Sequence, residues 1–267
     1  MKNIFKKKKT KKQIPKSKLR FRKNVVISFW VVIIFLVFGF IEIRHNGRLC
    51  TDIQINIENE ADNYFLSTED VIRLMTNGGK EKVLNNSFSN ISIKTLEKRV
   101  KEGNAFVEKC QIARNLKGVL FVDVTLKRPI ARFIRKSKAD VYVDNNGVVL
   151  NVLRKFTARV LLVTQSERTA PLDFKRNKQD KELLEMIRYI YQDPFLKAQI
   201  AQVDVLKNQD MILYLQLGKQ VVDFGNLNQW KSKLDRFKVF YKEILPRKGW
   251  NAYRKISLRF DKQIICE

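Results

Sequence analysis

Hydrophobic and polar residues alternate with short periods along most of the chain, but one long apolar run stands near its start. Val25 to Ile41 is a stretch of 17 residues without a charge. As a helix it would measure about 26 Å, the short end of what spans a bilayer. We therefore predict a single transmembrane helix over residues 25–43. Burial in a soluble core is the alternative, and it is disfavoured because nothing else in the chain could shield a helix that is apolar all round.

The next part of the chain has the pattern of a small α+β unit. Ile53, Ile55 and Ile57 alternate with polar residues, which predicts a strand. Ser67 and Asp70 stand at the positions of a capping box and predict a helix start. A second helix is expected over residues 92–103. Two strands, 106–114 and 119–127, follow it and are joined by a turn.

The second half of the chain is richer in strand patterns. A hairpin is expected at Val141–Leu150, where Asn146-Gly147 favours a tight primed turn. Apolar stripes at helical spacing predict helices over residues 179–193 and 227–245, the second ended by Pro246 and Gly249. Further strands are expected at residues 158–163, 200–206, 211–217, 221–225 and 255–266. The fold class is therefore α+β, with a β-rich domain and flanking helices after the first unit.

Charge refines the expectation of a membrane helix. The chain has 53 Lys and Arg against 27 Asp and Glu, a net charge of +26. Twelve of the basic residues and no acid lie in residues 1–24, which predicts a cytoplasmic tail and places residues 44–267 outside the cytoplasm. No small-residue cleavage site follows the apolar run, so we expect an uncleaved anchor. The Lys6–Lys9 run could instead be a nucleic-acid patch, but next to a membrane span it is more simply a topology signal.

Residues typical of catalytic and metal-binding sites are scarce in this sequence. The one histidine, His45, lies at the predicted membrane edge, and the three cysteines, Cys50, Cys110 and Cys266, form no C-x-x-C motif. The Asp-x-Asp sequence that an anchored glycosyltransferase usually needs does not occur. A wall hydrolase with two carboxylates stays open on composition alone. We expect no enzyme, no cofactor and no metal site. A Cys50–Cys110 bridge also stays open, and Cys110 is expected to be packed within the fold.

Several motifs together carry a resemblance to a known family. The strand-helix-helix-strand-strand order ends at Arg128-Pro129-Ile130-Ala131, the hairpin reads Asp144-x-x-Gly147-x-Val149, and the last strand follows Gly249-Trp250. With these features the chain resembles the bacterial division protein family FtsQ/DivIB, in a Bacteroidota-like form. Its first unit is similar to a polypeptide-transport-associated (POTRA) domain. Lys127 stands where the family usually has an acidic residue.

The resemblance implies an organisation and a role. We expect a basic cytoplasmic tail (1–24), a transmembrane helix (25–43), a POTRA domain (50–130) and a β-rich domain (131–267). The protein would be a non-catalytic scaffold of the divisome, anchored in the inner membrane with its bulk in the periplasm, enriched at the septum and helping to control septal wall synthesis. The alternative is another POTRA-containing envelope scaffold or chaperone, against which the single span argues. No nucleic-acid partner is expected, because the bulk of the chain lies outside the cytoplasm.

The final segment is the expected partner surface. Ile256, Leu258 and Phe260 alternate with Ser257, Arg259 and Asp261, which predicts a strand with one inward and one wet face. We predict that Lys255–Ile264 is an exposed edge strand that recruits a partner by backbone pairing, and the alternative is a mid-sheet strand with no partner. The resemblance implies that FtsB-like and FtsL-like proteins engage this end of the β-rich domain, and that other division proteins contact the POTRA domain. The candidate partner-binding residues are Tyr253, Ile256, Ser257, Leu258, Arg259, Phe260 and Gln263.

Overall fold

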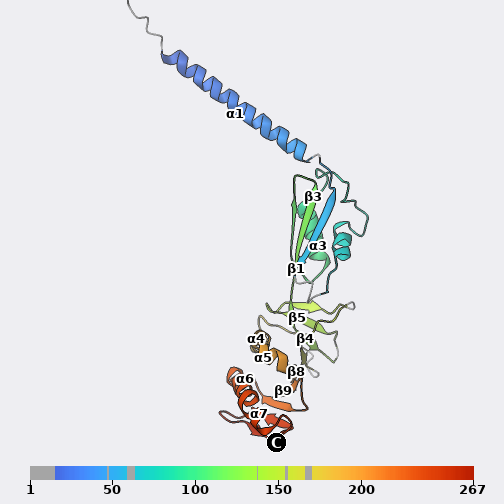
Figure 1. Ribbon diagram of the computed structural model, residues 1–267, viewed down its shortest axis with the longest axis vertical. Helices are drawn as coiled ribbons and strands as arrows, with labels where there is room; N and C mark the ends of the chain where they lie inside the picture. The colour runs from blue at the N-terminus through green and yellow to red at the C-terminus, as the bar shows by residue number, and fades with distance from the viewer. Residues whose placement is uncertain (1–15, 47, 59–63, 137, 154–155, 166–169) are drawn as a thin grey trace, which may run out of the picture. The chain divides into compact units, whose positions relative to one another are not determined.

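A computed structural model describes residues 16–46, 48–58, 64–136, 138–153, 156–165 and 170–267 of the chain (Figure 1). The first helix, α1, runs from Lys16 to Asn46 and contains the apolar run. Among these residues, no helix combines the length and apolarity that crossing a membrane requires. Most of the basic residues predicted as a cytoplasmic tail lie in residues 1–15, outside the described part, and the side chain of His45 is not described either.

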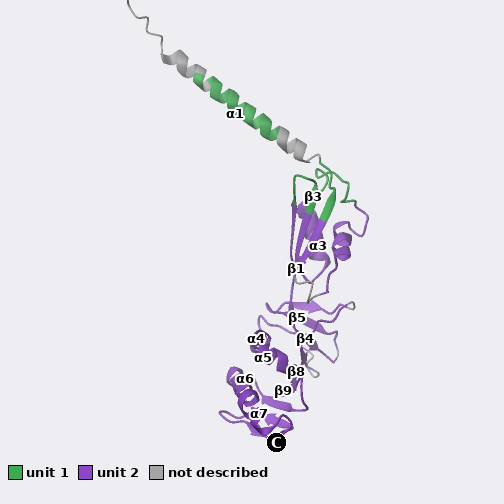
Figure 2. Cartoon of the chain, in the orientation of Figure 1, with its two compact units in different colours: residues 1–53, 82–92, 114–120 green, residues 54–81, 93–113, 121–267 purple. Residues whose placement is uncertain are grey.

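The chain divides into two compact units, which Figure 2 colours separately. Unit 1 comprises residues 1–53, 82–92 and 114–120. In it, the amide of Cys50 donates to the carbonyl of Asn86 (2.9 Å), and the amide of Thr51 donates to Gly118 (2.8 Å). Unit 2 comprises residues 54–81, 93–113 and 121–267, and contains the large sheet with its helices.

A small three-stranded sheet has the order β1-β3-β2, so the last strand in sequence is central. The expected element order is confirmed; the bounds are β1 Asp52–Glu58, α2 Thr68–Met75, α3 Ile93–Gly103, β2 Val107–Arg114 and β3 Val119–Leu126. The capping box at α2 is present, with the amide of Asp70 donating to the Ser67 hydroxyl. Strand β3 alternates as predicted, and its buried positions are Leu120, Val122, Val124 and Leu126.

A nine-stranded mixed sheet forms the second half of the chain. Its order is β12-β11-β10-β9-β8-β7-β4-β5-β6. The first strands are β4 Pro129–Ile134, β5 Val141–Asp144, β6 Val149–Asn151 and β7 Leu161–Thr164. The later ones are β8 Ile200–Val205, β9 Met211–Leu215, β10 Val221–Gly225, β11 Lys255–Ser257 and β12 Ile265–Cys266. The α+β class is thus confirmed, whereas the domain boundary at residues 130 and 131 stays a prediction.

Helices cover this sheet and supply much of its core. They are α4 Lys178–Gln192, α5 Pro194–Gln199, α6 Trp230–Val239, the π-helical turn η2 Phe240–Ile244, and α7 Leu245–Lys248. Pro246 does not end the helix as expected, because it lies in the first turn of α7, where no intrahelical amide donor is needed. Gly249, at φ 101°, ends it. The main core joins α4 and α6 to the strands through Leu184, Ile187, Leu234, Phe237 and their neighbours.

The β5–β6 hairpin differs from the predicted primed turn. The amide of Asp144 donates to the carbonyl of Val148, which closes a three-residue loop, and only Gly147 in that loop has a positive φ, 77°. A type I′ turn would need a positive φ at two successive residues. The Asp144 carboxylate caps the loop instead, accepting from the amides of Asn146 and Val148 at 2.8 Å each.

Candidate partner-binding site

The segment predicted as one terminal strand is two short strands joined by a turn. β11 pairs with β10 in parallel on one side and with β12 in antiparallel on the other. The expectation that Lys255–Ile264 forms an exposed edge is therefore wrong, since β11 has a neighbour on both sides. The edge is β12, residues Ile265–Cys266.

The two faces of this segment also differ from the predicted alternation. Ile256, Ser257 and Leu258 are all buried, with 0%, 9% and 0% of their surface exposed. Phe260, expected to face inward, is 47% exposed. The physical reason is that regular pairing ends after Ser257: the amide of Leu258 still donates to Asp223, and the chain then turns back through Lys262, at φ 57°.

An arginine from helix α6 holds this turn. Arg236 donates through Nη1 to the carbonyls of Phe260 (2.6 Å) and Gln263 (2.7 Å), and through Nη2 to that of Leu258 (3.3 Å). A planar guanidinium suits this task because its donors are fixed in a fork. The turn therefore depends on a side chain that lies far from it in sequence.

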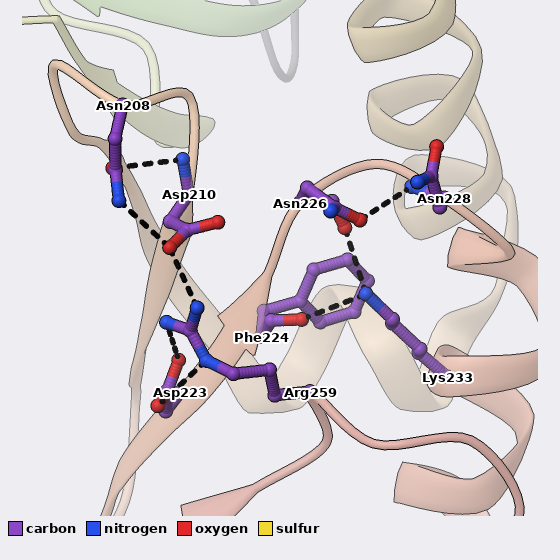
Figure 3. A network of polar contacts seen from close by, with 8 residues as sticks. All are labelled: Asn208, Asp210, Asp223, Phe224, Asn226, Asn228, Lys233 and Arg259. Carbon is purple, nitrogen blue, oxygen red and sulfur yellow. Dashed lines mark hydrogen bonds and ion pairs between the residues drawn. The ribbon is translucent and has the colours of Figure 1, made fainter.

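Arg259, expected on the solvent-exposed face, is tied to one acid in β10 and one in the β8–β9 loop (Figure 3). Its Nη1 lies 2.7 Å from Asp210, and its Nη2 lies 2.9 Å from Asp223. The Asp210 carboxylate also accepts from the Asn208 amide group (2.8 Å). The Arg259 side chain is 42% exposed, but the carboxylates are only 13% and 20% exposed. Arg259 therefore fastens the start of the turn to β10 and to the β8–β9 loop.

A buried lysine fixes the connection between β10 and α6 (Figure 3). The Lys233 ammonium donates to the carbonyls of Phe224 (3.0 Å) and Asn226 (2.8 Å), and it lies 5.1 Å from the centroid of the Phe224 ring. Burial lowers the pKa of Lys233, and the nearby charges of Arg236 and Arg259 lower it further. These contacts satisfy the carbonyls at the end of β10, so the helix leaves the sheet in a fixed direction.

The outward groups of the β12 edge follow from its pairing. Lys255 and Glu267 exchange both backbone hydrogen bonds, at 3.1 and 2.9 Å, so they form a hydrogen-bonded pair. The next pair, Ile256 with Cys266, is then a non-hydrogen-bonded pair, because the two kinds alternate along an antiparallel ladder. The amide and carbonyl of Cys266 consequently point away from β11, while those of Ile265 point toward it.

The other predicted site residues lie around this edge. Tyr253 is half-buried and its ring centroid lies 6.0 Å from that of Phe240, so it serves as packing. The side chain of Gln263 is exposed, although its carbonyl is held by Arg236. The structure thus brings Phe260 and Gln263 to the surface and buries Ile256, Ser257 and Leu258 beneath it. Ile265 and Cys266 were not among the predicted partner-binding residues, because the pattern indicated one continuous strand and gave no sign that a separate edge strand follows the turn.

The described residues offer no group of three or more His, Cys, Asp or Glu side chains that could hold a metal ion.

The three cysteines are free thiols, so the Cys50–Cys110 bridge that the sequence left open is not formed in this structure. Burial, helped by the charges of Glu97 and Asp123, raises the pKa of Cys110 to about 11. The thiol is therefore protonated and unreactive near neutral pH.

Comparison with known families gives two matches that together span most of the chain. Residues 128–267, just over half of it, match the family described as FtsQ/DivIB, C-terminal related. Residues 48–125 match a POTRA-like domain. No curated protein matches the chain.

Proposed function

Since the chain belongs to the FtsQ/DivIB family, we propose that it is a non-catalytic scaffold of the bacterial division machinery. The match over residues 128–267 carries this proposal, and the POTRA-like match over residues 48–125 agrees with it. In the proposal, α1 anchors the protein in the inner membrane. The uncharged run within α1, with Val25 to Phe38 mostly exposed, supports that role. The bulk of the chain would then lie in the periplasm, where it helps to control septal wall synthesis.

Partner recruitment is proposed at the β12 edge. An edge strand carries unpaired backbone donors and acceptors that an added strand can use. The outward amide and carbonyl of Cys266 are such groups. The exposed side chain of Ile265 (39%) is next to Cys266 in sequence, and that of Phe260 (47%) lies in the turn that precedes β12. FtsB-like and FtsL-like division proteins are the proposed occupants, and other division proteins would contact the POTRA-like region.

A pair of proline substitutions tests this docking edge. Cys266→Pro removes an outward amide, whereas Ile265→Pro removes an amide that faces β11. We expect Cys266→Pro to keep the cooperative melting transition and to lose pull-down of the FtsB-like and FtsL-like proteins. Ile265→Pro, the matched control, should lower the melting temperature as well. Pull-down at the wild-type level by a folded Cys266→Pro variant would exclude β12 as the docking edge.

Localisation and topology test the wider role. A fluorescent fusion should form a midcell band at constriction; an even peripheral ring would favour the alternative of another POTRA-containing envelope scaffold. An alkaline phosphatase fused after Glu267 should be active, because we propose that this end is periplasmic. An inactive fusion that is stably expressed would contradict the proposed orientation.

A further inference from the structure

A cationic groove lies away from the β12 edge, at the start of β7. Two adjoining cavities of about 500 and 390 Å³ share the residues Ala158, Arg159, Val160, Tyr191 and Lys197. The larger cavity is also lined by Arg128 and Phe156, and the smaller by Ile130, Leu161, Leu162, Ile190 and Ile200. We call this surface the cationic groove. It combines three basic side chains, Arg128, Arg159 and Lys197, with an apolar and aromatic lining.

The three cations of the groove have no acidic partner in the described part of the chain. Neither cavity is lined by an Asp or Glu there, and none of the ion pairs found among those residues involves Arg128, Arg159 or Lys197. The Lys197 ammonium instead lies 4.3 Å from the centroid of the Tyr191 ring. The nearest acid in sequence, Asp193, is used elsewhere: it caps α5 and pairs with Lys238 at 3.0 Å.

The wall of the groove is held in place by buried aromatic residues. The amide of Ala158 donates to the hydroxyl of Tyr142 (3.0 Å), which is fully buried. The Phe156 ring packs edge-on against that of Phe65, with centroids 5.0 Å apart. Phe156 and Ala158 are therefore held in place before any ligand arrives. Binding to such a surface costs little conformational entropy.

From these observations we propose that the cationic groove binds an acidic peptide segment of a partner protein, with carboxylates on the three cations and an apolar side chain in the smaller cavity. We infer the acidic character of the peptide from charge complementarity, because three cations line the groove without a counter-charge among the described residues. The apolar lining favours a peptide over a bare polyanion, since phosphate or sugar groups would not cover the half-buried side chains of Leu161 and Leu162. This site is independent of the β12 edge and of the partners proposed there.

The test uses the full chain in detergent micelles and three probes. The first is a short fluorescein-labelled peptide in which glutamates flank a Leu-Phe pair, read by fluorescence anisotropy. The second is the same peptide with Gly-Gly in place of Leu-Phe. The third is a phosphatidylglycerol vesicle, read by co-sedimentation. The groove variant is Arg128→Glu with Arg159→Glu, and the matched control is Lys175→Glu with Lys219→Glu, two exposed lysines outside both cavities.

We expect the groove variant to bind the first peptide at least about tenfold more weakly than wild type, because two attractions become repulsions. The control variant should bind within about twofold of wild type. The Gly-Gly peptide should also bind several-fold more weakly to wild type. Equal losses in both variants would show diffuse charge attraction and overturn the proposal. So would equal binding of the two peptides, or a loss confined to the lipid vesicles. Circular dichroism melting checks that both variants fold.

Discussion

The surroundings of the β11–β12 turn and the cationic groove each contain three conspicuous cations, but these cations have different partners. Near the turn, Lys233 and Arg236 of α6 donate to backbone carbonyls, and Arg259 bridges two carboxylates. In the cationic groove, the three basic side chains form no ion pair with any described residue. Net charge alone therefore does not identify a binding surface. A cation that is paired within the fold has a structural role, whereas a cation with no partner among the described residues is available to a ligand.

The largest effect on stability is expected at Arg236. Its replacement by Met leaves three carbonyls of the turn without their donor, so we expect a loss of about 2–3 kcal/mol in the free energy of unfolding. Urea denaturation measures this. Arg236→Lys should recover part of the loss, since an ammonium can reach fewer of the carbonyls. A loss below about 0.5 kcal/mol for Arg236→Met would show that the turn is stable without the hydrogen bonds from Arg236.

A smaller loss is expected for Arg259→Gln, about 1–2 kcal/mol, because Asp210 and Asp223 lose their counter-charge while the arginine site itself is partly wet. Combining it with Asp210→Asn should cost less than the sum of the two single changes. Additive losses in this double-mutant cycle would mean that the observed ion pair contributes nothing.

The Arg99–Glu81 pair extends the comparison to the POTRA-like region, with a smaller effect. Hydrogen bonding from Arg99, at 2.7 Å, lowers the pKa of Glu81 below its ordinary value. The contribution of this ion pair to the stability of the fold is therefore complete above the pKa of Glu81 in the unfolded state, about 4.3. It is lost as the pH falls through the lower pKa that Glu81 has in the folded state. Melting temperatures of wild type and Glu81→Gln should differ at pH 7 and converge at low pH. A constant difference between pH 7 and pH 2 would contradict this.

The groove cations should matter least for stability. Arg128→Glu and Arg159→Glu are each expected to change the free energy of unfolding by less than about 0.5 kcal/mol, because no described partner is lost. Urea denaturation alongside Arg236→Met makes the comparison direct. A loss of more than about 1 kcal/mol in either groove variant would mean that its cation is structural.

Local patterns predicted those parts of the fold that depend on neighbouring residues. The capping box at Ser67 and Asp70 joins residues three apart, and the alternation of β3 reflects burial along a single strand. Both signals stand within one short stretch of sequence, so the element order of the POTRA-like region could be predicted.

The features that the sequence did not predict depend on residues distant along the chain. The alternation from Ile256 to Asp261 resembles a continuous strand, but the turn that interrupts it is held by Arg236, about twenty residues earlier. The cationic groove likewise collects Arg128, Arg159 and Lys197 from three separate segments. Of these, the sequence singled out only Arg128, as part of a junction motif, because the convergence of charges is visible only after folding.

The parallel pairing of β10 with β11 has a consequence for biosynthesis. A parallel pair requires a crossover, which here runs through α6, η2 and α7 before the chain returns to the sheet. During synthesis, β11 can join β10 only after that crossover has been made, and β12 only after β11. The β12 edge is therefore among the last parts of the sheet to form, so a chain whose crossover has not yet folded would not display it. Partners that recognise this edge would select for copies in which the crossover and both final strands of the sheet have folded.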